Sequence, residues 1–147
     1  MEWNRKTWLS TLSKAGPEAV IELWDRLGLA PEFKVLRAPE CGLVMTQGRM
    51  GGTGDAFNLG EMTVTRCSVT LTDGRTGHAY VAGRSKQHAE VVAQIDALMQ
   101  GSEAALISEE VLQPLRKSLE ARREEAGKKA AATRVEFFTL SRSADVK

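Results

Sequence analysis

The segment MTVTRCSVTLTDGRTGHAYVA, residues 62–82, decides the fold. Its first half alternates with a period of two, which predicts a half-buried strand over 62–72. Asp73-Gly74 is typical of a hairpin turn, and Gly77–Ala82 is then the returning strand. One face of this strand carries Thr63, Thr65, Cys67, Val69 and Leu71, and the other carries Arg66, Ser68, Thr70 and Thr72.

Further strands and helices are expected on either side of this hairpin. Phe33–Arg37 and Gly42–Gln47 predict two strands around Pro39. Residues 2–28 predict two short helices that form a helical hairpin, with a break at the Gly16-Pro17 step.

Downstream of residue 83 the apolar period returns to that of a helix. Ser85 is a suitable N-cap for a helix that ends near Gly101, and a second helix is expected from about Ser108. Pro114 either kinks this second helix or marks its start. A charged, alanine-rich stretch continues it, and residues 134–140 are expected to form a strand or extended arm.

The order of elements predicts an α+β fold. We expect one domain over residues 1–147, with a small antiparallel sheet of three to four strands in residues 32–83. N-terminal helices flank this sheet on one side of the sequence, and C-terminal helices and the arm, residues 85–147, flank it on the other.

Composition limits the classes of function. The 20 Lys and Arg residues nearly balance the 19 Asp and Glu residues, so electrostatics gives nucleic-acid binding little support. The sequence contains no apolar run of about 18 residues, so it predicts no membrane span. Cys41 and Cys67 have neither metal-ligand spacing nor a disulfide framework, so we expect reduced thiols and a cytoplasmic protein.

The glycine-rich stretch that follows Arg49 is the first candidate site. One interpretation is a nest of backbone N–H groups that holds an anion or lets a partner's backbone approach, and the other is a plain hairpin loop between Gln47 and Met62. Neither a Walker sequence nor a dinucleotide fingerprint fits, because no Gly-Lys-Ser/Thr and no helical pattern follow. The candidate residues are Arg49, Gly51, Gly52 and Gly54.

A second candidate site lies at the predicted start of the helix after Ser85. Arg84 and Lys86 add their charges to the free N–H groups of the helix end, so an anion or an acidic partner group can bind there. His88 either joins this site or lies at the edge of the core, hydrogen-bonded to backbone.

The last candidate is a C-terminal arm, and two further kinds of site lack support in the sequence. Phe137, Phe138 and Leu140 either cover this chain's own sheet or dock into a partner's groove. His78 lacks an acidic or cysteine partner at ligand spacing, and no catalytic triad is evident, so we expect neither a metal site nor catalytic residues.

Several motifs stand in order along the chain at characteristic spacings. They are Gly42-Leu43-Val44 leading to Arg49–Gly54, Leu71–Gly74, Gly83-Arg84 with Lys86–Glu90, Ile95–Gln100, and Arg134–Thr139. Together they resemble the PhnG family, the G subunits of the bacterial carbon–phosphorus lyase complex. Two departures are Glu136, where aspartate is expected, and His78, where an aromatic is expected.

The resemblance implies a subunit that acts with the H, I and L subunits in phosphonate catabolism. Together these transfer ribose triphosphate from ATP to an alkylphosphonate, and a J subunit later cleaves the carbon–phosphorus bond with an iron–sulfur cluster and S-adenosylmethionine. The G, H, I and J subunits form the core complex, and K and L are ATP-binding-cassette-type subunits. The resemblance implies no cofactor and no catalytic residue in this chain.

A second hypothesis is that the chain binds its ligand without partner subunits. A self-sufficient phosphate-ligand or nucleotide-binding module would be built from Arg49, Arg84, Lys86 and His88. Calorimetry of the isolated chain with ATP separates the two hypotheses.

Overall fold

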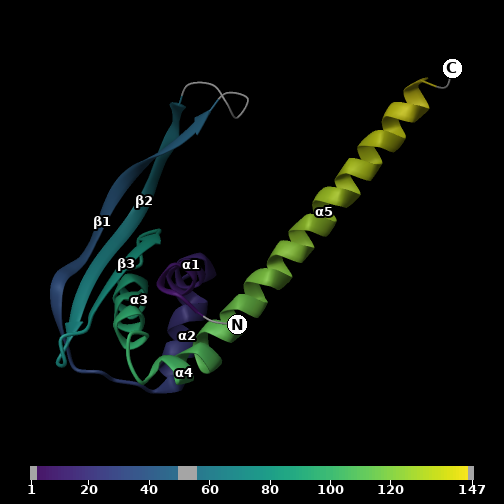
Figure 1. The fold of residues 1–147 in the computed structure, drawn as a ribbon. Helices are drawn as coiled ribbons and strands as arrows, with labels where there is room; N and C mark the ends of the chain where they lie inside the picture. Colours follow the sequence, from purple (N-terminus) through teal and green to yellow (C-terminus); the bar gives the residue numbers. More distant parts are fainter. Residues whose placement is uncertain (1–2, 50–55, 146–147) are drawn as a thin grey trace.

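The structure is a computed structural model that describes the backbone of residues 3–49 and 56–145 and the side chains of 3–45 and 60–132. It has an α+β fold, as predicted: all the helices lie on one side of an antiparallel sheet (Figure 1). Along the chain the elements are α1 (Arg5–Ala15), α2 (Pro17–Leu27), β1 (Phe33–Arg49), β2 (Ala56–Leu71), β3 (Thr76–Ala82), α3 (Lys86–Leu98), α4 (Ala104–Ile107), the π-helix η2 (Ser108–Leu112) and α5 (Gln113–Asp145).

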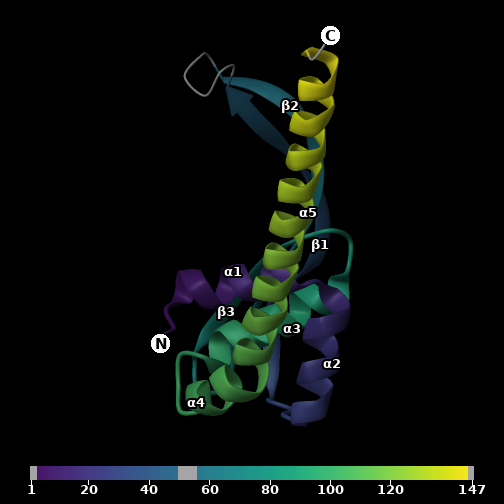
Figure 2. The same ribbon diagram turned by 90° about the vertical axis from the view of Figure 1, so that its right-hand side faces the viewer.

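The two N-terminal helices form where the sequence predicts them. Asn4 closes a capping box with Thr7 at the start of α1, and Pro17 occupies the first turn of α2. Gly28 ends α2 with φ of 71°, a left-handed conformation that favours glycine. The expected hairpin arrangement is wrong, because α1 and α2 run in clearly different directions (Figures 1 and 2). Both helices contribute to the core instead, through Trp8, Leu12, Ala15, Val20 and Trp24.

Within the described residues the sheet has three strands in the order β1-β2-β3. The two separate strands expected around Pro39 are one continuous strand, β1. Its pairing with β2 shifts register on both sides of Arg37, before Glu40. A proline has no N–H to donate, and the irregularity in this edge strand accommodates Pro39.

The β1–β2 hairpin is longer than the third strand. β3 pairs with β2 only over Val64–Thr70, whereas β1 and β2 stay paired as far as Arg49 and Ala56. The far half of the hairpin therefore projects from the body as a two-stranded ribbon (Figure 1).

Helix α3 is the centre of the core. It packs on β2 and β3, and every residue from Val91 to Leu98 is buried. The contact with β3 is close at Gly77, where a Cβ atom would lie 1.8 Å from the carbonyl oxygen of Ala93. This glycine is needed because it lets a strand and a helix approach one another directly.

The helical region after residue 103 is continuous through α4, η2 and α5. Gln113 N–H donates to Ser108 O, which is the five-residue spacing of a π turn, immediately before Pro114. Pro114 is the second residue of α5, so it lies at the start of that helix, as one of the two alternatives expected. The π turn lies where the proline leaves a backbone bond unmade.

The strand or arm expected over residues 134–140 is wrong, because α5 stays helical to Asp145. Alanine, lysine, arginine and glutamate dominate Glu120–Ala132 and favour the helix strongly enough to carry it past Gly127. The C-terminal half of α5 extends away from the sheet (Figures 1 and 2), so this segment does not cover the chain's own sheet.

Candidate functional site

The glycine-rich stretch lies between the two long strands of the hairpin. Arg49 ends β1 and pairs with Ala56, and Gly51, Gly52 and Gly54 lie outside the described residues. A strand follows the stretch, so it is not a dinucleotide fingerprint. The anion-nest and plain-loop interpretations both stay predictions.

The structure separates the three residues predicted around Ser85. Ser85 caps α3 as expected, and the side chains of Arg84 and Lys86 are exposed. His88 is only 1 % exposed, and its Nε2 lies 3.0 Å from the carbonyl oxygen of Leu12. Burial lowers the pKa of His88 and favours the neutral ring. His88 is thus a backbone-bonded core histidine, and the cations alone remain at the surface.

Asp96 is a polar centre that the sequence analysis missed. It is fully buried in α3, and its carboxylate accepts from Arg5 Nη2 at 2.7 Å, Trp8 Nε1 at 2.8 Å and the backbone N–H of His78 at 2.9 Å. A lone acid inside the apolar stripe of residues 91–99 was the available signal. Its contacts tie α1 and β3 to α3, which is a structural role.

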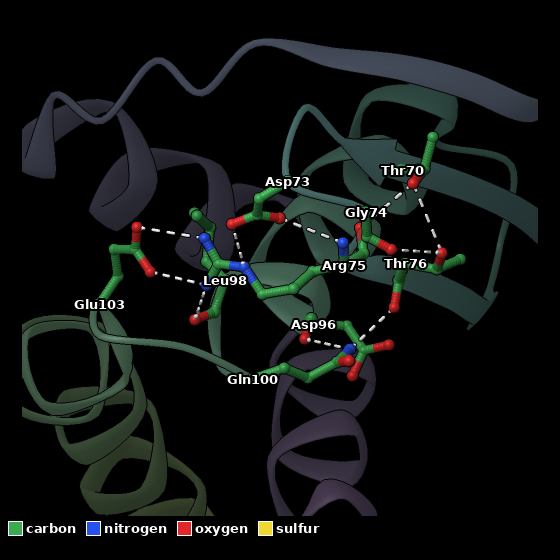
Figure 3. A network of polar contacts seen from close by, with 9 residues as sticks. All are labelled: Thr70, Asp73, Gly74, Arg75, Thr76, Asp96, Leu98, Gln100 and Glu103. Atoms are coloured by element: carbon green, nitrogen blue, oxygen red, sulfur yellow. Dashed lines mark hydrogen bonds and ion pairs between the residues drawn. The ribbon is translucent and has the colours of Figure 1, made fainter.

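A second network fixes the β2–β3 turn. Arg75 donates to Asp73 and Glu103, each at 2.8 Å, and to the carbonyl oxygen of Leu98 at 3.3 Å (Figure 3). The hydrogen bond from the backbone N–H of Arg75 is the largest cause of the lowered pKa of Asp73. The hydrogen bond from the Arg75 guanidinium is the largest cause of the lowered pKa of Glu103. The network holds the turn against the end of α3.

The outer edge of β3 is closed by side chains rather than by another strand. Gln100 donates to Thr76 O at 2.7 Å, Asp96 accepts from His78 N–H, and Ser13 donates to Tyr80 O at 3.4 Å. These groups occupy hydrogen-bonding positions that an added strand would need.

The face of the sheet that no helix of the described residues covers carries a hollow of about 310 Å³, and α1 borders this hollow. Ser68 Oγ and His78 Nδ1 lie 2.8 Å apart there. The alternation of residues 62–72 had placed Arg66 and Ser68 on this face, but the sequence analysis did not treat them as a site. The residues that line the hollow are Leu9, Ser13, Arg37, Arg66, Ser68, His78, Ala79 and Tyr80.

Neither a metal cluster nor a membrane-spanning helix is present in the part of the chain that the structure describes. No group of three His, Cys, Asp or Glu side chains in that part is placed to hold a metal ion. None of its helices is long and apolar enough to cross a membrane. Cys41 and Cys67 are free thiols, and burial, with a smaller contribution from the Glu90 charge, raises the pKa of Cys67 to about 11.

Comparison with known proteins identifies the family. The profile of the family described as phosphonate metabolism protein PhnG matches residues 3–143. The chain belongs to the PhnG family. A relative from Rhizobium meliloti (strain 1021), named alpha-D-ribose 1-methylphosphonate 5-triphosphate synthase subunit PhnG, is 38 % identical over 142 residues, 97 % of this chain and 91 % of the relative. The resemblance stated from the sequence motifs is therefore confirmed.

Proposed function

We propose that the chain is the G subunit of a cytoplasmic synthase complex in phosphonate catabolism. With the H, I and L subunits it transfers ribose triphosphate from ATP to an alkylphosphonate. The observation that carries this proposal is the 38 % identity, across almost the whole of both chains, to a relative named as a subunit of such a synthase.

The chain's part in this proposal is assembly and shaping of the site rather than the main chemistry. Its polar centres at Asp96 and Arg75 are used for internal hydrogen bonds. No cofactor is assigned to the chain: ATP is a co-substrate of the complex. The iron–sulfur cluster and S-adenosylmethionine belong to the J subunit, and K joins as a further ATP-binding-cassette-type partner.

Two projections are suited to contact partner subunits. The first is the far half of the β1–β2 hairpin, where Leu43 is 64 % and Met45 58 % exposed. A two-stranded ribbon has little stability alone, and exposed apolar side chains on it favour a partner that covers them. The second is the C-terminal part of α5, which carries Phe137, Phe138 and Leu140 in its sequence.

The alternative is a self-sufficient nucleotide-binding module. It needs Arg84, Lys86 and His88 to act together, and the burial of His88 against Leu12 O takes the imidazole out of that set. Calorimetry with ATP on the isolated full-length chain tests this alternative, which requires saturable binding that Arg84→Gln weakens.

Copurification tests the proposed assembly. A tagged chain expressed together with the H, I and J subunits is expected to retain all three, and deletion of residues 134–147 is expected to lose at least the I subunit. Deletion of 146–147 alone is the control, because α5 ends at Asp145. Full retention of every partner by the longer deletion would contradict the docking role of α5.

A further inference from the structure

The hollow on the uncovered face of the sheet has the composition of an anion site. Arg37 comes from β1 and Arg66 from β2, and both side chains are exposed. Neither guanidinium forms an ion pair with any residue that the structure describes. Glu40 is the cross-strand neighbour of Arg66, yet no ion pair forms between them in the described part of the chain.

The strand register brings the two cations to the same side of the sheet. Arg37 lies opposite Ser68, and Ser68 lies opposite His78 on the other side of β2. Arg66 follows two positions away on β2, opposite Tyr80. Directly opposite and diagonal side chains on one face lie about 5–8 Å apart at Cβ, within reach of a single ligand for side chains as long as arginine.

The Ser68–His78 pair supplies a further donor in either tautomer. If the Ser68 hydroxyl donates to Nδ1, the imidazole proton is on Nε2; if Nδ1 donates, the hydroxyl keeps its own proton. In both cases one N–H or O–H of the pair has no acceptor among the described residues. The phenol of Tyr80, which is 52 % exposed, adds another donor at the same rim.

Two guanidinium forks, an imidazole or hydroxyl donor and a phenol suit a doubly charged, tetrahedral oxyanion. Arginine forks match phosphate oxygens in pairs, and charge-assisted bonds of this kind are the strong ones. The hollow, at about 310 Å³, is at the lower limit of ligand pockets and holds a small group. We propose that Arg37, Arg66, Ser68, His78 and Tyr80 form a binding site for a terminal phosphate or phosphonate group.

Ligand titration followed by phosphorus NMR tests this site on the full-length protein, in its assembly where partners copurify. The probes are inorganic phosphate, methylphosphonate and tripolyphosphate, at an ionic strength held constant with NaCl. Saturable binding is expected, and Arg37→Gln or Arg66→Gln is expected to weaken it about tenfold or more, because each removes a charge-assisted contact. Ser68→Ala is expected to weaken it less.

The matched control is Arg26→Gln, which removes the same charge from α2, where Arg26 pairs with Glu22 at the surface. Equal affinities for phosphate and methylphosphonate mean that the site recognises one phosphorus group, whereas tighter binding of tripolyphosphate means that it recognises a phosphate chain. The proposal is overturned if the wild-type protein shows no saturable binding, or if Arg26→Gln weakens binding as much as Arg66→Gln. It is also overturned if the two arginine variants lose a partner subunit without changing anion affinity. Because the readout is anion binding, failure of this site leaves the proposed assembly intact.

Discussion

The two halves of the β1–β2 hairpin share the same strands but differ in what covers them. In the half that also pairs with β3, which we call the covered half, the face that carries Cys67, Val69 and Leu71 is buried under the helices. In the far half the same face continues through Leu43 and Met45, which pair with Thr63 and Glu61, and no described helix covers it. The alternation therefore specifies an apolar face along the whole hairpin, whereas the helices of this chain cover only part of it.

The largest expected effect comes from filling the contact between β3 and α3. Gly77→Ala places a Cβ atom 1.8 Å from a backbone oxygen that cannot move aside alone, so we expect a loss of about 3 kcal/mol or more in the free energy of unfolding. Gly42→Ala, where the hairpin leaves the three-stranded part of the sheet, is the control because its Cβ would meet nothing within 4 Å. Denaturant unfolding measures both, and equal stabilities of the two variants would contradict the close contact.

A smaller effect on stability is expected at the outer edge of β3, which side chains close. Asp96→Asn keeps the shape but removes the charge that faces Arg5 and places an amide donor among donors, so we expect a loss of about 2–3 kcal/mol. This loss of stability is smaller than that expected for a fully buried ion pair, because Arg5 is half exposed.

Glu22→Gln is the control for Asp96→Asn. It breaks a surface ion pair with Arg26, for which about 0.5 kcal/mol or less is expected. Thermal and denaturant unfolding of both variants provide the comparison. A loss at Asp96 no larger than that at Glu22 would mean that the carboxylate does not hold α1 and β3 to α3.

The sequence predicted the parts of the fold that depend on local pattern. The alternation over 62–72, the Asp73-Gly74 turn, the Ser85 cap and the helix break at Gly16-Pro17 all form as expected. The errors were at Pro39, where an edge strand tolerates a proline, and over residues 134–140, where helix propensity outweighed the strand-like aromatic pair. In each case the local signal was real, but its surroundings decided the outcome.

Site residues were harder to predict, because a site depends on which strands pair. Arg37 and Arg66 are far apart in the sequence, and only the register of β1 on β2 brings them to one hollow. His88 was weighed correctly as a possible core histidine, but its hydrogen bond to Leu12 joins residues 76 positions apart. Similarly, the partners of Asp96 come from α1 and β3, and nothing near residue 96 indicates them.

The smallest change in stability is expected from the far half of the hairpin, where the effect on assembly is the informative one. Leu43→Ser combined with Met45→Ser removes two exposed apolar side chains, so we expect the free energy of unfolding to change by no more than about 0.5 kcal/mol. Partner subunits that cover this face are expected to be lost on copurification, because two polar hydroxyls would replace the apolar contact.

Leu71→Ala on the same face of the covered half gives the opposite pattern. Leu71 is only 6 % exposed, so its truncation is expected to lower the free energy of unfolding by about 2–4 kcal/mol while leaving the far half unchanged. If the double serine variant instead destabilises the isolated chain as much as Leu71→Ala, then the far half packs against this chain itself. If it retains every partner at normal stability, its apolar face is not an interface. Loss of partners at unchanged stability is the one outcome that requires another subunit to complete the face that this chain covers only in part.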